Sequence, residues 1–176
     1  MARLFVAVQP PNEVLDALDR LARPEEPGVR WTRREHWHVT LRFLGEADPV
    51  AAAGALAELD GHEAEAVLGP TVTRLGRSVV CVPVQGLDEL AAAVRAATGS
   101  VGEPSDPRPF VGHLTLARLG RGARCGLVGT PFSARFTVRE VELVKSTLTA
   151  EGPIHEVLAH RGLSPREGPP GPAEAC

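Results

Sequence analysis

The chain lacks tyrosine and contains one methionine, one lysine and three cysteines among its 176 residues. The cysteines Cys81, Cys125 and Cys176 are widely spaced and form no CxxC pair, a usage that indicates a reducing compartment and no zinc knuckle. No apolar run approaches the roughly 20 residues of a membrane-spanning helix. Residues 1–8 are too short and too strand-like for a signal peptide. We therefore expect a cytoplasmic protein without a membrane partner.

Positive charge is also scarce, and nearly all of it is arginine because Lys145 is the single lysine. The formal net charge of −3 argues against a surface that binds polyanions everywhere, so any contact with nucleic acid must be local. Apolar residues make up 43% and charged residues 23% of the chain, as in an ordinary soluble domain. This length fits one domain, and we expect a monomer.

Alternation and helical spacing of apolar residues predict an α+β fold. Strands are predicted at 3–8, 29–32, 37–44, 65–75, 78–84, 110–119 and 154–159, and helices at 14–21, 49–59 and 87–99. The segment 136–148 is predicted to form one long strand or two short ones. The order predicts a bilobal domain over residues 1–163, with two pseudo-symmetric antiparallel sheets lining a central cleft and helices on the outside. Residues 164–176 are rich in Pro, Gly and Glu and are predicted to be a disordered tail.

One eight-residue pattern occurs twice, as HVTLRFLG at 38–45 and as HLTLARLG at 113–120. Five of the eight positions are identical, and both copies carry His-x-Thr. Residues two apart on a strand project from the same face, roughly 6.6–6.8 Å apart. His38 and Thr40 should therefore share one face, as should His113 and Thr115, while the intervening aliphatic residues face the core.

These four side chains offer the chemistry needed to open a strained phosphate ester. Two imidazoles can act as general acid and general base near neutral pH, and threonine hydroxyls can donate to phosphate oxygens. Arg42 has the same strand parity as His38, so it is predicted to face the cleft and bind phosphate. Arg118 has the opposite parity to His113, so a direct role is not expected unless the strand bends.

Other interpretations compete with this one. A single His-x-Thr is usually structural, because Thr is a common strand residue; two copies with polar residues retained on the open face favour catalysis. A zinc site built from His36, His38 and His113 is conceivable, but neither motif offers a Cys, Asp or Glu to complete it. We therefore expect no metal and no cofactor.

The stretch Trp31–Glu46 resembles the first signature of the two-histidine phosphoesterases, and Phe110–Arg118 resembles the second. The closest branch is the RNA 2′,3′-cyclic phosphodiesterases, also known as 2′-5′ RNA ligase-like or LigT-like proteins. The segments Arg3–Val8 and Leu143–Leu148 also resemble that branch, so the likeness covers residues 3–163.

The resemblance implies metal-independent hydrolysis of a 2′,3′-cyclic phosphate to a 2′-phosphate, on an RNA or oligonucleotide end or on a cyclic nucleotide. It implies that His38 is the proton donor and His113 the proton acceptor, roles that the sequence symmetry alone leaves open. Thr40 and Thr115 would hold the phosphate. The alternatives are 2′-5′ ligase or 2′-5′ phosphodiesterase activity, and a nucleotide-binding or RNA-binding module without catalysis.

Several residues depart from the family pattern or remain unassigned. Gly112 stands where a proline is usual, and His155 where an aromatic residue, often tyrosine, is common. His36 is a candidate for the rim of the site. Of the remaining residues, Trp37 and Phe5 are predicted to pack in the core, and His62 and His160 are predicted to lie on the surface. The sequence does not decide whether Trp31 and Arg77 face the cleft.

Overall fold

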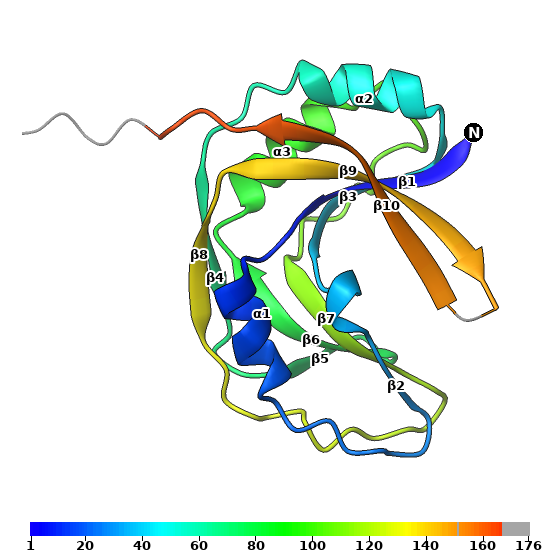
Figure 1. The fold of residues 1–176 in the computed structure, drawn as a ribbon, viewed down its shortest axis with the longest axis vertical. Coiled ribbons are helices and arrows are strands. Elements are labelled where there is room, and N and C mark those ends of the chain that lie inside the picture. The colour runs from blue at the N-terminus through cyan, green and yellow to red at the C-terminus, as the bar shows by residue number, and fades with distance from the viewer. Residues whose placement is uncertain (151, 167–176) are drawn as a thin grey trace, which may run out of the picture.

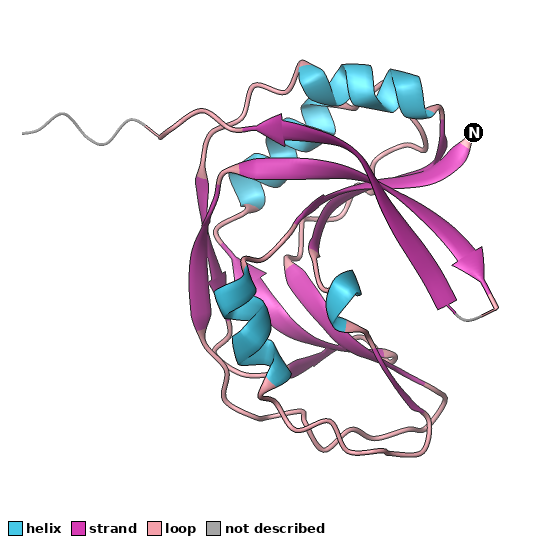
Figure 2. Cartoon of the chain, in the orientation of Figure 1, coloured by secondary structure: helices cyan, strands magenta, loops and turns pink. Residues whose placement is uncertain are grey.

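The computed structural model describes residues 1–150 and 152–166. Its ten strands and four helices confirm the predicted α+β class (Figures 1 and 2). The strands are β1 Ala2–Val8, β2 Val29–Trp31, β3 Val39–Ala47, β4 Ala64–Leu68, β5 Thr73–Leu75, β6 Val79–Gln85, β7 His113–Leu119, β8 Ala134–Val138, β9 Glu140–Thr149 and β10 Gly152–Gly162. The helices are α1 Asn12–Asp19, the short 3₁₀ helix η1 Arg34–His36, α2 Pro49–Ala57 and α3 Asp88–Ala97.

The predicted elements are mostly present, with two divisions. The predicted strand 65–75 is β4 and β5, separated by a turn that contains Pro70, a residue without an N–H to donate. The segment 136–148 forms two strands, β8 and β9, separated at Arg139, which is the second of the two predicted alternatives. α1, α2 and α3 each start and end within a few residues of their predictions, whereas η1 was not predicted. α2 begins as expected, because the side chain of Asp48 accepts a hydrogen bond from the N–H of Val50 at 3.0 Å.

The strands form one curled antiparallel sheet rather than the two sheets that the sequence predicted. Its order is β10-β9-β1-β3-β7-β6-β4-β8, with β2 beside β7 and β5 beside β6. The two motif strands, β3 and β7, are neighbours at its centre, with three further strands beyond each of them on this path. They are paired through Val39 and Leu114, and this pairing joins the two predicted lobes into one sheet.

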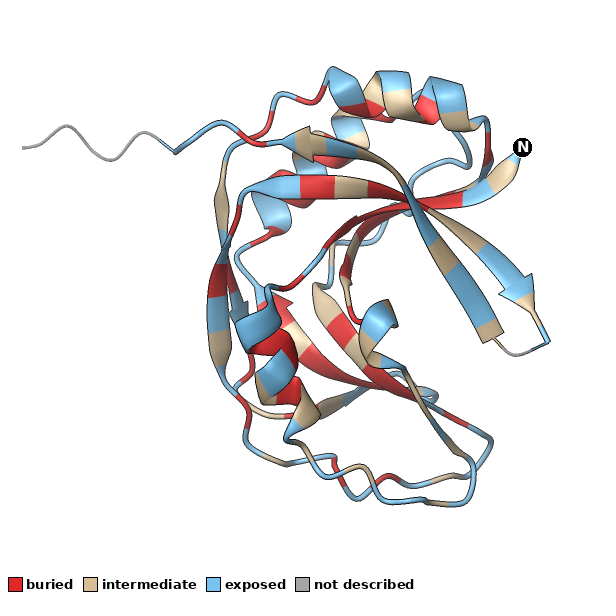
Figure 3. Cartoon of the chain, in the orientation of Figure 1, coloured by how far each residue is buried: buried red, intermediate tan, exposed pale blue. Residues whose placement is uncertain are grey.

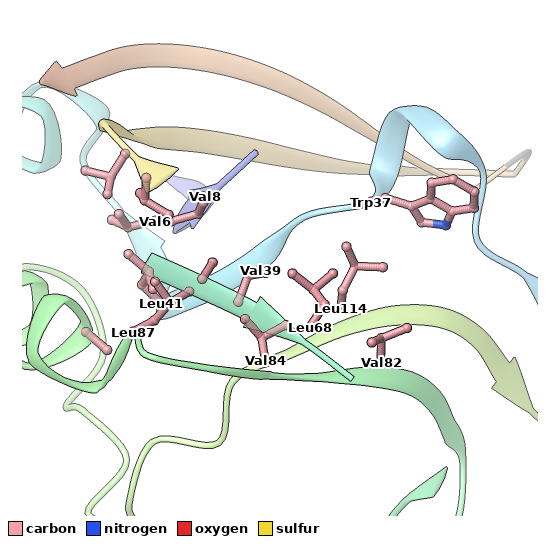
Figure 4. Close-up of a cluster of buried hydrophobic side chains, with 14 of the residues drawn as sticks. Val6, Val8, Trp37, Val39, Leu41, Leu68, Val82, Val84, Leu87 and Leu114 are labelled. Atoms are coloured by element: carbon pink, nitrogen blue, oxygen red, sulfur yellow. The ribbon is translucent and has the colours of Figure 1, made fainter. Parts of the chain in front are cut away.

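One large apolar core covers one face of this sheet. Val39, Leu41 and Leu114 lie in it together with buried residues of β1, β4 and β6, and Figure 4 shows them converging. Leu90, Ala91 and Val94 of α3 add to the same core. The alternating burial along the strands is visible in Figure 3, and the far end of the β9–β10 hairpin is more exposed than its base. None of the described helices is long and apolar enough to cross a membrane.

The described part of the predicted tail is attached to the domain. Ser164 forms a bridge with His62, and the Arg166 guanidinium lies against the Glu89 carboxylate. The domain boundary predicted at residue 163 stays a prediction. The remaining tail residues, 167–176, lie outside the described residues.

Candidate functional site

Trp37 anchors the segment that leads into the first motif. Its side chain is fully buried in the core, as predicted, with the Arg23 guanidinium carbon 5.1 Å from the ring centroid. Trp37 itself has an extended backbone, so the side chains of its neighbours His36 and His38 project away from it. Arg34 fixes the preceding turn of η1 to α1 through ion pairs with Asp16, at 2.7 Å, and with Asp19.

Both motif histidines are held by the same local hydrogen bond. His38 Nδ1 lies 2.7 Å from the carbonyl oxygen of His36, and His113 Nδ1 lies 2.8 Å from that of Val111. A carbonyl can only accept, so each Nδ1 carries the hydrogen and donates it. Each neutral ring therefore presents an unprotonated Nε2, which can accept a proton or, once protonated, deliver one.

The sheet brings the two motifs together. Because Val39 and Leu114 are antiparallel partners, the register sets His38 beside Thr115 and Thr40 beside His113. All four side chains lie on the face opposite the main core, and all four are half-buried. We call this face the motif face, defined by His38, Thr40, His113 and Thr115.

The motif face lies apart from two hollows in the described part of the chain. One hollow, of about 540 Å³, lies between the segments 60–64 and 164–166 and α3. The other, of about 630 Å³, lies between the β1–α1 turn and β8. Neither is lined by a motif histidine or threonine.

Each copy of the eight-residue motif contains a β-bulge at its fourth residue. On β3, Thr40 opposes Ala7 and Arg42 opposes Val6, which leaves Leu41 without a partner. On β7, the corresponding extra residue is Leu116. An extra residue exchanges the two faces of the strand beyond it. Side chains after the bulge therefore face the side opposite to that predicted by simple alternation.

This bulge corrects the prediction for Arg42, which does not lie on the motif face. Its side chain is 4% exposed and points to the C-terminus of α3. Nη1 donates to Thr98 Oγ1 at 2.6 Å, and Nη2 donates to the carbonyl of Glu103 at 3.1 Å. Longer bonds reach the carbonyls of Arg95 and Val101, both at 3.3 Å. Arg42 thus satisfies carbonyls at the end of a helix and has no access to a phosphate.

The bulges on β3 and β7 each place one residue on the motif face that simple alternation did not predict there. Phe43 takes the position expected for Arg42 and is 62% exposed. Arg118 follows the bulge on β7 and is exposed beside its cross-strand neighbour Arg30. No ion pair links Arg30 or Arg118 to an acid among the described residues. The sequence analysis had allowed Arg118 to share the face of His113 only if the strand bent. The bulge at Leu116 is that bend.

A second group of rings surrounds His38. Phe5 stacks on the His38 ring with centroids 4.9 Å apart, and it belongs to a small apolar cluster separate from the main core. His155 on β10 lies edge-on to both, with centroids 5.4 Å from His38 and 5.2 Å from Phe5. The His36 ring lies 4.5 Å from that of His155. Phe5 is buried, as predicted, and it also lines the histidine site.

Burial governs the protonation of these rings. It lowers the pKa of His38 to about 4, with a further decrease from the positive charge that His155, His36 or His113 would carry, while the hydrogen bond to the His36 carbonyl opposes the decrease. Burial, and then the charge of His36, also lowers the pKa of His155. His38 is therefore a neutral ring at neutral pH in the empty site.

The other singled-out residues lie outside this group. Trp31 donates its indole N–H to the carbonyl of Pro24 at 3.1 Å and packs against the core, so it does not face the motif residues. Arg77 lies exposed in the β5–β6 turn, and His62 is exposed. Cys81, opposite Thr115, is buried, and burial raises its thiol pKa to about 11, so it is not a nucleophilic thiolate.

Metal-ligating side chains gather at one place among the described residues, and it is not the motif face. Glu140, Glu142 and His160 come within 4.8 Å of one another on β9 and β10. Neither His38 nor His113 belongs to this group. The donors at the motif face are two imidazoles and two hydroxyls, a poor set for zinc.

Gly112 allows the second motif to pack closely. Its carbonyl accepts a hydrogen bond from Val84 at 2.9 Å, and a Cβ built on Gly112 would collide with the carbonyl oxygen of Val84. A proline or any other side chain at 112 would push β6 away from the residue just before His113. The departure from the family pattern at this position therefore has a local packing cause.

Sequence comparisons identify relatives of known activity. A family model described as LigT-like phosphoesterase matches residues 8–68, which include the first motif. The RNA 2′,3′-cyclic phosphodiesterase of Thermus thermophilus is 32% identical, over 98% of this chain and 97% of that protein. The enzyme of the same name from Geobacillus stearothermophilus is also 32% identical over 88% of this chain, but the match spans only 55% of its length.

Solved structures share the fold. A Thermus thermophilus protein, TT0787, superposes with a TM-score of 0.73 at 29% identity, covering 94% of this chain and 100% of that chain. E. coli LigT complexed with 3′-AMP superposes with a TM-score of 0.73 at 24% identity, covering 92% and 98%. At that identity the likeness to E. coli LigT concerns the fold alone.

Proposed function

Because the chain belongs to the RNA 2′,3′-cyclic phosphodiesterase family of LigT-like phosphoesterases, we propose that it hydrolyses 2′,3′-cyclic phosphate ends to 2′-phosphates. The observation that carries the proposal is the matched pair of imidazoles on adjacent strands. His38 and His113 each donate Nδ1–H to a carbonyl two residues earlier and each leave Nε2 free, with a threonine hydroxyl beside each ring.

The reaction divides between the two rings. His113 Nε2 accepts a proton from water, and the water oxygen forms a new bond to phosphorus. The bond from phosphorus to the 3′ oxygen breaks, and His38 Nε2 delivers a proton to that oxygen. The product carries a 2′-phosphate and a free 3′-hydroxyl, and the donor and acceptor must exchange a proton with solvent before the next turnover.

Three donors are positioned to bind the phosphate. The hydroxyls of Thr40 and Thr115 lie on the same face as the two rings and can donate to the non-bridging oxygens. Arg118 follows Thr115 on that face and can supply a charge-assisted hydrogen bond. This assigns to Arg118 the contribution that the sequence had assigned to Arg42.

The substrate class follows from chemistry on the same face and from the relatives. Exposed Phe43 offers a ring on which a nucleobase can stack. E. coli LigT has been crystallised with 3′-AMP and with ATP, and the shared fold supports a nucleotide as the ligand here. We propose RNA or oligonucleotide ends as substrates and cyclic mononucleotides as their shortest form.

Product analysis tests the proposal. Adenosine 2′,3′-cyclic phosphate is incubated with the full chain, with and without EDTA, and 2′-AMP and 3′-AMP are separated chromatographically. We expect 2′-AMP alone and the same rate with EDTA, since no step needs a metal. A 3′-AMP product would contradict the assigned roles, and loss of activity in EDTA would favour a metal-dependent hydrolase. A parallel incubation with a 2′-5′ linked dinucleotide detects the alternative activity.

A further inference from the structure

Two further histidines, His36 and His155, lie beside His38, the proton donor that the family resemblance implies. The rings of His36 and His155 are 4.5 Å apart between centroids, and His155 is 5.4 Å from His38. They come from η1, from the segment before β3 and from β10, so the fold rather than the local sequence assembles them. Phe5 closes the group by stacking on His38 and meeting the edge of His155. We call His36, His38 and His155 the histidine cluster.

No carboxylate neutralises the histidine cluster among the described residues. Ser146, opposite His155 on β9, carries no charge, and neither does Phe5 on β1. The charged groups nearest to the cluster are paired with one another: Glu35 with Arg33, Arg34 with Asp16 and Asp19, and Glu156 with Lys145. His113 on β7 is itself basic. Farther along β1, β3, β9 and β10 lie Arg3, Arg42, Glu46, Glu140, Glu142, His160 and Arg161. Glu140 and Glu142 lie beside His160, and no described carboxylate forms an ion pair with a ring of the cluster.

A proton on any one of the three rings therefore opposes a proton on the other two. Burial penalises the charge on His38 and on His155, and the neighbouring rings add repulsion instead of compensation. His38 is therefore uncharged at neutral pH in the free enzyme, although the proposed reaction needs a proton on it.

An anion on the motif face removes this contradiction. A phosphate charge about 4–5 Å from the ring, at the effective dielectric constant of about 20 that suits protein sites, would favour a protonated His38 by roughly 300- to 1000-fold. That factor is large enough to move the donor from uncharged to substantially protonated near neutral pH. The same anion would have little effect on a histidine that was already charged in the empty enzyme.

We infer that burial and the rings of His36 and His155 together hold the donor His38 uncharged in the free enzyme, so that His38 takes up its proton only when an anionic phosphate is bound. His36 and His155 are thus positioning residues that act through His38. The role of this proton in catalysis rests on the proposed function. The effect of a bound anion on the protonation of His38 does not, and it can be measured without turnover.

The proton balance of the cycle is complete. On binding, one proton passes from solvent to His38 Nε2, and in the reaction it moves to the departing 3′ oxygen. One proton of the attacking water moves to His113 Nε2 and returns to solvent after product release. Uptake and release cancel over a turnover, and no co-reactant other than water is consumed.

The test follows the ring nitrogens of the histidines by nitrogen-detected NMR across a pH titration of the full chain. Sulfate is the probe, because it keeps its charge throughout and cannot be hydrolysed. We expect His38 in the sulfate-free protein to titrate near pH 4, and saturating sulfate to raise its midpoint by at least about 2.5 pH units. His62, which is exposed elsewhere on the surface, should not respond.

The variants His155→Gln and His36→Gln each remove one ring without adding charge, and His62→Gln is the matched control. Each cluster variant should raise the sulfate-free midpoint of His38 by about half a pH unit, a threefold change in its proton equilibrium, whereas the control should leave it unchanged. Thermal unfolding establishes that each variant is folded, and either cluster variant alone is sufficient for the comparison.

The two proposals fail in different ways. A sulfate-free midpoint of His38 in the ordinary histidine range, or one that neither cluster variant moves, overturns the role of His36 and His155 even if the enzyme is active. A protein that shows the expected coupling but does not open a 2′,3′-cyclic phosphate overturns the proposed function instead. If sulfate moves neither His38 nor His113, the site does not couple protons to an anion and the inference is rejected.

Discussion

Val39 of β3 and Leu114 of β7 are direct cross-strand partners, and through them the two motif strands meet at the centre of the sheet. Both side chains are fully buried. The residues on either side of each, which are His38 and Thr40 on one strand and His113 and Thr115 on the other, consequently lie on the opposite face. One apolar contact thus sets the relative positions of four polar groups.

Removing the motif hydroxyls should weaken transition-state binding without loss of structure. Thr40→Val and Thr115→Val keep the shape of each side chain and delete one donor. We expect kcat/KM for a 2′,3′-cyclic nucleotide to fall by roughly 5- to 150-fold in each variant, corresponding to about 1–3 kcal/mol per unmet hydrogen bond. Thr137→Val, on the exposed side of β8, is the control. Unchanged kinetics in both motif variants would refute the role of the hydroxyls.

Arg42 should matter for stability and not for catalysis. Arg42→Met removes the bonds to Thr98 and to the carbonyls after α3 while keeping the aliphatic stem. We expect the free energy of unfolding to fall by about 2–4 kcal/mol, as when several buried acceptors lose their donor. Urea unfolding measures this loss. Activity per folded molecule should stay within about twofold of the wild type; a large decrease in a fully folded sample would restore Arg42 to the site.

Arg118 should bind the substrate phosphate. Arg118→Met removes the charge from the motif face and leaves the strand position filled. We expect kcat/KM to fall by roughly 10-fold or more, as for the loss of a charged hydrogen bond of about 1.5–3 kcal/mol, and the defect to shrink as salt screens the charge in the wild type. Arg135→Met on β8 removes an exposed arginine away from the motif. Equal activity of the two variants would contradict the assignment.

Stability should decrease on mild acidification because of His38. The folded state holds its pKa near 4, while the unfolded chain binds a proton at about pH 6.5. As pH falls from about 6.5 to about 4, the unfolded state gains a proton that the folded state does not, so the free energy of unfolding decreases. Denaturant unfolding at several pH values should therefore give a shallower decrease for His38→Gln than for the wild type or His62→Gln. Parallel curves for all three proteins would show that His38 is not held neutral by the fold.

The sequence was sufficient to predict the strands and most of the site. The repeated His-x-Thr pairs lie on one face because strict alternation holds from His38 to Thr40 and from His113 to Thr115. Beyond Thr40 and Thr115 the prediction was wrong, because a bulge at Leu41 and Leu116 inserts one residue and reverses the alternation. A bulge depends on how the neighbouring strand pairs, and that pairing is not encoded in the local pattern.

The sequence also could not predict that the two sheets join, or that the histidine cluster forms. Both depend on pairing between strands that are distant along the chain. The contact between Val39 and Leu114 links residues 75 positions apart along the chain. His155 meets His36 only because β10 folds back along β9 and β9 pairs with β1. His155 was noted as a departure from the family pattern, but its neighbours emerged only from the sheet order.

Two histidines on adjacent strands are proposed to open the cyclic phosphate, and their removal tests this directly. The measurement is kcat/KM on adenosine 2′,3′-cyclic phosphate for His38→Ala and His113→Ala beside the wild type, with folding checked for each. Each variant should lose roughly 100-fold or more, because general acid and base steps contribute about 10²–10⁴-fold in rate, while remaining folded. Wild-type activity in either folded variant would contradict the proposed roles of the two rings.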